Sequence, residues 1–422
     1  MGNAVIAANV LHHLFTSWDC GIYAGANAVF LLCKKMFNMF RIILHRFVLV
    51  VCGILAVQMA MSQASFKLKF KKSAVYAGIE VGSKGVKMSV LEIEKSREEA
   101  GNFNALKDTS VNTDFISFNE SSYSATLQAI TALYRQAQGE YKIPSDNIFT
   151  VMSSGVKVLS QKDNNQQWVD KLRNSFRLAI NEPQRSFDLV SVQDEARLSH
   201  LGIVPQTKRF STFLIDIGSG NTKGGYFPNL DISTIRLFEL SWGTKSIANA
   251  VDMRIETDQS LANYRKQLYR VLEGSANQEI VFAVNVSGAY NMSDNIAFSG
   301  GIAWALANLV HPELENDDVV PVTYSEVEQF YNRIYENPGY YASQALAARA
   351  GGSASEKAAL IKLANTIHKV FDQRSLMSGT GLLLRIMRQF EGVYEQKQFY
   401  LVKNGQVGWI SAYVDKQIIS GR

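Results

Sequence analysis

Residues 210–227 read FSTFLIDIGSGNTKGGYF. An apolar run ends near Asp216, a glycine-rich turn follows, and a second alternating run comes next, which is the pattern of a β-hairpin. Residues 75–93, VYAGIEVGSKGVKMSVLEI, show the same pattern 136 residues earlier, with Glu80 in the place of Asp216. A pattern repeated at such an offset predicts two similar domains.

The remaining segments alternate between helical and strand patterns. Helices are predicted over residues 124–138, 168–180, 258–272, 325–335, 356–370 and 379–390, and strands over 148–152, 187–192 and 280–286. A last hairpin is predicted at 399–414, because Asn404 and Gly405 stand between two alternating runs. The fold class expected from these patterns is α/β.

The length of the chain supports more than one domain, because 422 residues exceed the ~100–200 of an ordinary domain. Pro205 and the polar residues after it interrupt an ordered run, so a boundary is predicted near residue 206. The predicted organisation is a leader over residues 1–64, a first domain over 65–206 and a second over 207–422.

The leader has the order of a secretory signal peptide. Residues 41–65 have a basic start, an apolar run over 47–61, and small residues at Ser62 and Ala64. The apolar run has 15 residues, fewer than the ~20 that a membrane-spanning helix needs. We therefore expect an exported, periplasmic protein with its signal peptide at about 36–64. Anchoring to the membrane by an uncleaved leader is the alternative.

Charge and cysteine usage exclude several functions. The net charge is +5, but residues 65–422 hold 39 basic and 37 acidic residues, which gives little steering toward nucleic acid. Cys20, Cys33 and Cys52 all lie in the leader, so no disulfide framework or thiolate metal site is expected after it. The histidines there show no metal-ligand spacing. We expect no nucleic-acid partner.

The two glycine turns suit the binding of phosphate, because glycine lets backbone N–H groups approach an anion closely. The phosphate-binding candidates in and beside the turns are Gly82, Ser83, Lys84, Gly218, Ser219, Gly220, Asn221, Thr222 and Lys223. Glu80 and Asp216 lead the two turns and are candidate ligands for a divalent cation. Two unrelated hairpins with ordinary turns are the alternative.

Together with the turns, residues 187–204, FDLVSVQDEARLSHLGIV, resemble the exopolyphosphatase/guanosine pentaphosphate phosphohydrolase family of the actin/hexokinase/heat-shock-protein-70 superfamily. Residues 241–249, 297–310 and 371–387 resemble further segments of that family. The resemblance covers about residues 74–392. It implies a two-lobed actin-like ATPase fold, which is ribonuclease H-like, with a cleft between duplicated domains.

The resemblance also implies roles for individual residues. Glu195, which directly precedes Ala-Arg, matches the general base for the water that attacks the terminal phosphate. Arg197 and Lys157 match phosphate-binding positions, and Mg²⁺ is expected between Glu80 and Asp216. The alternative for Glu195 is an acid that only favours the dipole of its helix.

Four positions depart from the family pattern. Glu80 replaces an aspartate, Lys84 an asparagine, Lys157 an arginine and Lys223 a glutamate. The added lysines are suited to neutralise a polyphosphate chain or to replace part of the metal's role. Equally, they are suited to a pair of lobes that binds polyanions and no longer hydrolyses them.

The leading functional prediction is a Mg²⁺-dependent phosphoanhydride hydrolase that releases terminal phosphate from inorganic polyphosphate. Polyphosphate is favoured over nucleotides because an exported protein meets little nucleoside triphosphate. The alternatives are a non-catalytic sensor of polyphosphate or nucleotide and an actin-like ATPase. The expected partner is polyphosphate or another phosphoanhydride, and a homodimer is left open.

Overall fold

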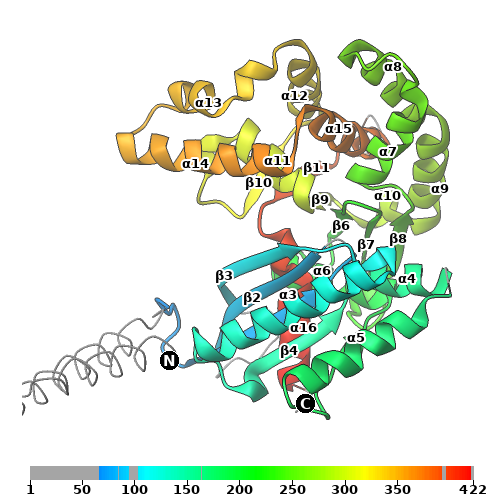
Figure 1. Cartoon of the computed structure of the whole chain (residues 1–422). Helices are drawn as coiled ribbons and strands as arrows, with labels where there is room; N and C mark the ends of the chain where they lie inside the picture. The colour runs from blue at the N-terminus through cyan, green and yellow to red at the C-terminus, as the bar shows by residue number, and fades with distance from the viewer. Residues whose placement is uncertain (1–65, 84, 95–102, 163, 392–395, 420–422) are drawn as a thin grey trace, which may run out of the picture. The chain divides into compact units, whose positions relative to one another are not determined.

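Two β-sheets of related topology form the framework of the chain (Figure 1). The computed structural model describes residues 66–83, 85–94, 103–162, 164–391 and 396–419. The predicted signal peptide and Lys84 lie outside the described residues. Residues 65–422 form one compact unit, separate from residues 1–64.

The first sheet has the order β3-β2-β1-β4-β5. Its strands are β1 Ser73–Val81, β2 Gly85–Glu94, β3 Phe103–Asn112, β4 Ile148–Met152 and β5 Asp188–Leu189. β1, β2 and β3 form an antiparallel meander, and β4 and β5 continue the sheet in parallel with β1.

The second sheet has the order β10-β11-β9-β6-β7-β8. Its strands are β6 Thr212–Ile217, β7 Thr222–Tyr226, β8 Arg236–Leu240, β9 Asn295–Ser299, β10 Val319–Val322 and β11 Gln398–Val402. β6, β7 and β8 form the meander, β9 and β11 continue in parallel, and β10 adds an antiparallel edge strand. The second sheet therefore repeats the first and adds one strand. This repeat confirms the predicted two-lobed, ribonuclease H-like fold.

Helices surround both sheets. Those before the second sheet are α3 Glu120–Gly139, α4 Ser154–Lys162, α5 Gln166–Ala179 and α6 Val192–Ile203. Those after β8 are α7 Thr244–Ile255, α8 Leu261–Val271, α9 Asn277–Ser287, α10 Ala289–Met292, α11 Gly301–Val310, α12 Tyr324–Glu336, α13 Ser343–Ala350, α14 Ala354–Val370, α15 Gln373–Met387 and α16 Gly405–Ile419. No helix in the described part of the chain has the length and hydrophobicity needed to cross a membrane.

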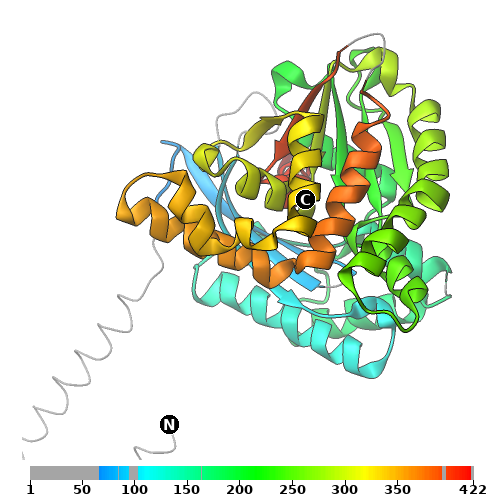
Figure 2. The same cartoon turned by 90° about the horizontal axis from the view of Figure 1, so that it is seen from above.

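Each sheet has its own hydrophobic core. The first core joins Ile79 and Met88 of the first sheet to Ile130 of α3 and Phe176 of α5. The second core is larger and extends from the second sheet to the helices of residues 301–387, coloured yellow to orange in Figure 2. Two cores of this kind make each sheet the centre of a lobe.

α6 and α16 connect the two sheets. α6 contacts β6 and β7 of the second sheet, and α16 contacts α6 as well as β1 and β2 of the first. The strands of the first sheet lie within residues 73–189 and those of the second within 212–402. α16 packs on the first sheet although it follows the last strand of the second sheet in sequence. A cut of the chain at residue 206 would therefore separate α16 from the sheet that it covers.

Most predicted helices and the strand at residues 148–152 are confirmed, but two elements were predicted wrongly. Residues 280–286 belong to the helix α9, in which Ile280 and Val284 are buried while Phe282 and Val286 are 69% and 66% exposed. An apolar run of this length does not distinguish a strand from a helix.

The hairpin predicted at residues 399–414 is also wrong, because β11 is followed by the helix α16. The side chain of Asn404 donates to Asp318 in place of forming the hairpin turn, and the next residues enter the helix. Ile410 of α16 packs on β1, where a side chain at Gly78 would lie 2.6 Å from Ile410 Cγ1. The strand predicted at 187–192 is shorter, since Ser191 already caps α6.

Candidate functional site

An equivalent backbone hydrogen bond closes each of the two glycine turns. The backbone N–H of Gly82 donates to the carbonyl of Gly85 at 2.8 Å, and that of Gly218 donates to the carbonyl of Asn221 at 3.0 Å. The first turn joins β1 to β2, and the second joins β6 to β7. The similarity predicted from the sequence therefore extends to the backbone geometry.

Each hairpin places an acid opposite a lysine. Glu80 pairs with Lys87 across β1 and β2, and Asp216 pairs with Lys223 across β6 and β7. The two lysines differ in burial, because Lys87 is exposed whereas the Lys223 side chain is only 12% exposed. The same local pattern therefore creates two different electrostatic environments.

Lys223 forms a buried ion pair with Glu195. Its Nζ atom lies 2.7 Å from Oε1 of Glu195, whose side chain is 3% exposed. The other carboxylate oxygen, Oε2, accepts from the backbone N–H of Ser154 at 2.7 Å. Since Ser154 begins α4 and Lys223 lies on β7, Glu195 connects the first lobe to the second turn.

α6 holds Glu195 at this point. The Ser191 side chain caps the helix by accepting from the backbone N–H of Asp194 at 3.0 Å, which fixes the first turn. Ala196 and Leu198 are buried, so the helix cannot rotate without exposing them. The predicted base is therefore held by both a cap and packing.

Both members of the ion pair are charged. Burial alone would raise the pKa of Glu195, but Lys223 and the hydrogen bond from Ser154 hold that pKa below its usual value. Burial alone would lower the pKa of Lys223, but the negative charges of Glu195 and Asp216 hold it above its usual value. A buried pair in which both partners are stabilised acts as one fixed unit.

Glu80 lies in a different environment. Burial raises its pKa, and the negative charge of Glu195 acts in the same direction, while Lys87, Lys223 and a hydrogen bond to the Trp409 side chain oppose the rise. The net effect is a raised pKa. Trp409 belongs to α16, so the C-terminal helix contributes directly to the first turn.

Asp216 is held by the end of β9. Its Oδ1 atom accepts from the Ser299 hydroxyl at 2.8 Å. Gly300 follows with φ at +94°, and a Cβ there would lie 2.2 Å from the carbonyl of Ile217, so only glycine fits. A third glycine turn therefore supports the acid that leads the second one.

The second turn has a supported base and an open tip. The carbonyls of Gly218 and Ser219 accept from the first N–H groups of α7, at Thr244 and Lys245, over 3.0 and 2.7 Å. Ser219 and Gly220 are exposed, and Gly220 has open space where a Cβ would stand. The tip is therefore the part of the turn that a ligand can reach.

Thr222 supports the second turn, and its predicted contact with phosphate stays a prediction. Its hydroxyl is buried and donates to the carbonyl of Trp242 at 2.7 Å, so it fixes the turn from behind.

The first turn contacts the start of α4. Gly82 and Ser83 are half-buried, and a Cβ at Gly155 would lie 2.6 Å from the Ser83 hydroxyl. Lys157 lies on α4 and Arg197 on α6, and both are half-buried. The contacts that connect Glu195 to the turns involve neither of these two residues.

The residues at this site do not fit the expected Mg²⁺. Within the described ranges, no group of three or more acidic, histidine or cysteine side chains is placed to hold a metal ion. Mg²⁺ prefers oxygen ligands in octahedral geometry. Here the ammonium of Lys223 contacts Glu195 and also interacts with Asp216 and Glu80. A cation is already present among the carboxylates.

Three residues that hold the acids of the site, Ser154, Ser299 and Trp409, were missed from the sequence, and so was Lys87, the exposed lysine opposite Glu80. For Lys87 a signal existed, because it follows Glu80 by the same seven residues that separate Lys223 from Asp216. The other three contact the turns only through the tertiary fold, and no local pattern indicates them.

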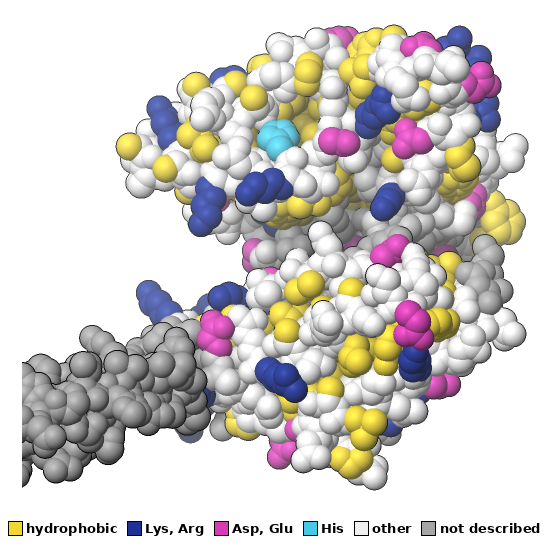
Figure 3. All heavy atoms as spheres, viewed as in Figure 1, with side chains coloured by type: hydrophobic (Ala, Val, Ile, Leu, Met, Phe, Trp, Pro, Cys, Tyr) yellow, Lys and Arg dark blue, Asp and Glu magenta, His cyan; other side chains and the backbone are white. Residues whose placement is uncertain are grey.

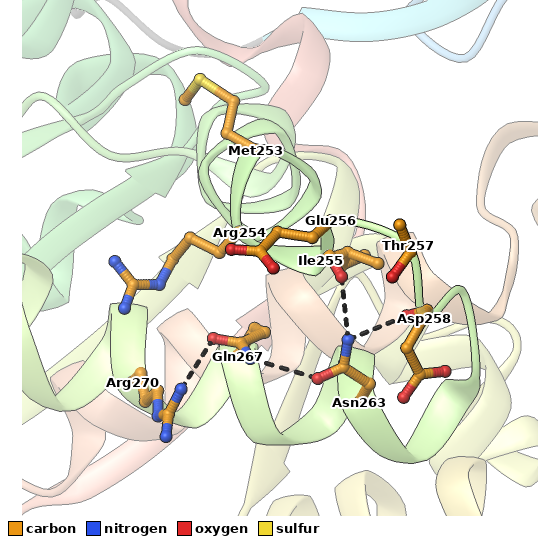
Figure 4. Close-up of a pocket in the computed structure, with 9 residues that line it drawn as sticks. All are labelled: Met253, Arg254, Ile255, Glu256, Thr257, Asp258, Asn263, Gln267 and Arg270. Carbon is orange, nitrogen blue, oxygen red and sulfur yellow. Dashed lines mark hydrogen bonds between the residues drawn. The ribbon is translucent and has the colours of Figure 1, made fainter.

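A separate pocket of about 520 Å³ lies where α7 ends and α8 begins (Figure 4). Asn263 closes the loop there by donating to the carbonyls of Ile255 and Asp258, while Arg270 donates to Gln267. Because α7 starts at the second turn and ends at this pocket, the pocket is not part of the candidate site. The surface is also hollowed between the two lobes (Figure 3).

Comparison with known proteins identifies relatives of the fold. No protein-family model matches the chain, and no curated protein matches its sequence. A crystal structure of the Aquifex aeolicus member of the Ppx/GppA family matches with 15% identity and a TM-score of 0.55, over 83% of this chain and 99% of that one. An exopolyphosphatase from Cytophaga hutchinsonii matches with 12% identity and a TM-score of 0.53, over 82% and 98%.

At identities this low, the structural similarity shows a shared fold and does not show a shared activity. The resemblance predicted from the sequence is confirmed at that level: the chain has the two-lobed actin-like fold of the Ppx/GppA exopolyphosphatase structures.

Proposed function

We propose that this protein binds phosphoanhydrides, with inorganic polyphosphate as the leading ligand, at its two glycine turns. The observation that carries the proposal is that equivalent backbone hydrogen bonds close both turns, while Glu195 pairs with Lys223 after the second turn and accepts from Ser154 at the start of α4, the helix that the first turn contacts. A polyphosphate chain presents several phosphates in a row, so it can contact two such turns at once.

The chemistry of the turns supports this ligand class. The exposed tip at Ser219 and Gly220 offers backbone groups without a bulky side chain, which suits close approach of a phosphate oxygen. Lys223 offsets part of the negative charge of the acids beside the turn, which reduces their repulsion of a polyanion. The structural neighbours include proteins described as exopolyphosphatases, which is consistent with a phosphate chain as ligand.

The state of Glu195 favours binding over hydrolysis. A general base works best when its pKa lies near the working pH and when it can reach the attacking water. Glu195 is 3% exposed, both of its carboxylate oxygens are engaged, and its pKa is held low. These features make it a structural anion rather than a proton acceptor.

Hydrolysis of a phosphoanhydride is the second candidate. The position of Glu195 between the two turns and the likeness to structures described as phosphatases favour it. In that reaction Glu195 accepts a proton from water as oxygen bonds to the terminal phosphorus. The bridging P–O bond breaks, which yields orthophosphate and a chain shorter by one phosphate.

The test compares the full-length wild type with Glu195→Gln and with the control Asp194→Asn, which removes an exposed acid next to it. Release of orthophosphate from polyphosphate, ATP and guanosine pentaphosphate is measured with and without Mg²⁺, and polyphosphate binding is measured by calorimetry. We expect all three proteins to bind polyphosphate and none to release phosphate above the blank.

Release that Glu195→Gln abolishes and Asp194→Asn preserves would establish the hydrolase. Selective binding and turnover of ATP would favour the actin-like ATPase. Absence of polyphosphate binding by the wild type would contradict the proposal. If the predicted signal peptide at residues 36–64 directs export, the ligand is encountered outside the cytoplasm, where polyphosphate is a more plausible ligand than a nucleotide.

A further inference from the structure

We propose that Lys223 is a resident cation that takes the place of a divalent metal ion, so that the site binds its ligand without metal. For the identity of the ligand this inference rests on the proposed function. Its prediction about metal binding does not, because metal binding can be measured on the protein alone.

The ammonium of Lys223 interacts with carboxylates from three elements. Lys223 Nζ contacts Glu195 of α6 at 2.7 Å, and it interacts electrostatically with Asp216 of β6 and Glu80 of β1. A divalent cation bridging the two turns would have to bind the same carboxylates. The ammonium and a metal ion would therefore compete for the same carboxylates and repel each other.

The ammonium is held in this position and does not swing freely. Its side chain is only 12% exposed, and Lys223 is fixed in register opposite Asp216 on β7, which pairs with both β6 and β8. Leaving Glu195 without a partner would strand a buried carboxylate, which is strongly unfavourable. Mg²⁺ also gives up its water shell reluctantly, so it is poorly suited to displace a cation that is already paired.

Lys87 provides a matched comparison within the same molecule. It stands opposite Glu80 as Lys223 stands opposite Asp216, but it is exposed. Substitutions at the two positions change the same side chain at the same place in a hairpin. Only at Lys223 do they change the buried charge among the carboxylates.

The first experiment uses the full-length wild type and needs no variant. Mn²⁺ is added to the protein alone, and the free ion is followed by electron paramagnetic resonance. Polyphosphate binding is then measured by calorimetry in EDTA and with excess Mg²⁺. We expect no saturable Mn²⁺ site, and we expect polyphosphate to bind in EDTA with an affinity within about threefold of that in Mg²⁺.

The second experiment exchanges the resident charge. Lys223→Glu adds a carboxylate to Glu80, Asp216 and Glu195, so this variant is expected to gain a saturable Mn²⁺ site, whereas Lys87→Glu is not. Lys223→Gln is expected to weaken polyphosphate binding in EDTA by about tenfold or more, and Lys87→Gln by less than about threefold. Circular dichroism and thermal melting check that each variant is folded.

The inference would be overturned by a saturable Mn²⁺ site in the wild type, or by polyphosphate binding that EDTA abolishes and excess Mg²⁺ restores. A folded Lys223→Glu variant without a Mn²⁺ site would also contradict it. If a Lys223 variant does not fold, the wild-type titrations still show whether the site binds a metal ion and whether ligand binding needs one. A wild type that binds no polyphosphate under either condition would refute the proposed function. The Mn²⁺ titration would still test whether Lys223 takes the place of a metal ion.

Discussion

At the residue scale, the ion pair between Lys223 and Glu195 governs both stability and chemistry. A buried charge without a partner is costly, whereas a pair with additional hydrogen bonds is tolerated. Glu195 has both, because it also accepts from the backbone of Ser154. The pair therefore behaves as a structural unit on which the two turns depend.

Removal of the lysine from this pair should destabilise the protein strongly. Lys223→Ala leaves Glu195 buried and without its ammonium, so we expect a loss of about 3–5 kcal/mol in the free energy of unfolding. Lys87→Ala removes an exposed lysine, so we expect a change within about 1 kcal/mol. Urea denaturation of the two variants and the wild type measures the free energies of unfolding. Equal losses in the two variants would contradict the burial of the ion pair between Lys223 and Glu195.

The pH dependence of stability should differ in sign between two glutamates. The pKa of Glu80 is raised in the folded state, so its contribution to stability is present at low pH and is lost as pH rises through that pKa. Glu80→Gln should therefore raise the melting temperature at neutral pH, and the gain should shrink in acid.

Glu92 is the control, because its pKa is shifted in the opposite direction to that of Glu80. Burial would raise its pKa, but hydrogen bonds from the backbone of Lys69 and Phe70, together with side-chain donors, hold it below its usual value. Glu92→Gln should lower the melting temperature at neutral pH, and this loss should shrink in acid. Melting curves across the acid range measure both, and the same sign for both variants would contradict the assignment.

The sequence indicated which residues belong to the candidate site, but not which of them contact one another. Glu80, Glu195, Asp216 and Lys223 were all identified, and the structure brings them together. Their pairing depends on the distance between α6 and β7, which no local pattern encodes. For this reason the sequence suggested a metal between Glu80 and Asp216, whereas the ion pair of Lys223 with Glu195 beside these acids was not foreseen.

At the element scale, the amphipathic helices were predictable and the buried ones were not. α3 has a capping box at Asn119 and one buried face, and its sequence shows both features. α16 is enclosed by α6 and the first sheet, so its residues are buried on nearly all sides and lack helical periodicity. A turn signal at Asn404 and Gly405 then favoured the wrong element.

The contact between α6 and α16 depends on two glycines. A Cβ at Gly202 of α6 would lie 1.9 Å from the carbonyl oxygen of Gly408 in α16. Gly202→Ala should force the helices apart and cost about 1–3 kcal/mol or more. Gly139→Ala at the end of α3, where no atom lies within 4 Å, is the control and should change stability by no more than about 1 kcal/mol.

Thermal melting compares the two alanine variants. A neutral Gly202→Ala would show that the two helices do not pack as closely as described. Because Trp409 follows Gly408 and hydrogen-bonds Glu80, a displaced α16 should also weaken polyphosphate binding.

At the scale of the whole molecule, duplication explains the arrangement of the site. Two sheets that share five strands in equivalent order present two turns closed by equivalent hydrogen bonds, and α6 and α16 pack between the sheets. This architecture was predictable because each turn is a local pattern that occurs twice. The loss of equivalence between Lys87 and Lys223 was not, because only the packing of α6 buries one of them.

The central claim is that the site binds a phosphoanhydride with a lysine in place of a metal. Calorimetric titration of full-length protein with polyphosphate in EDTA tests it most directly, with Lys223→Gln measured alongside. We expect saturable binding by the wild type, and an affinity lower by about tenfold or more in Lys223→Gln. Binding that requires a divalent metal ion, or that is equally strong in Lys223→Gln, would contradict it.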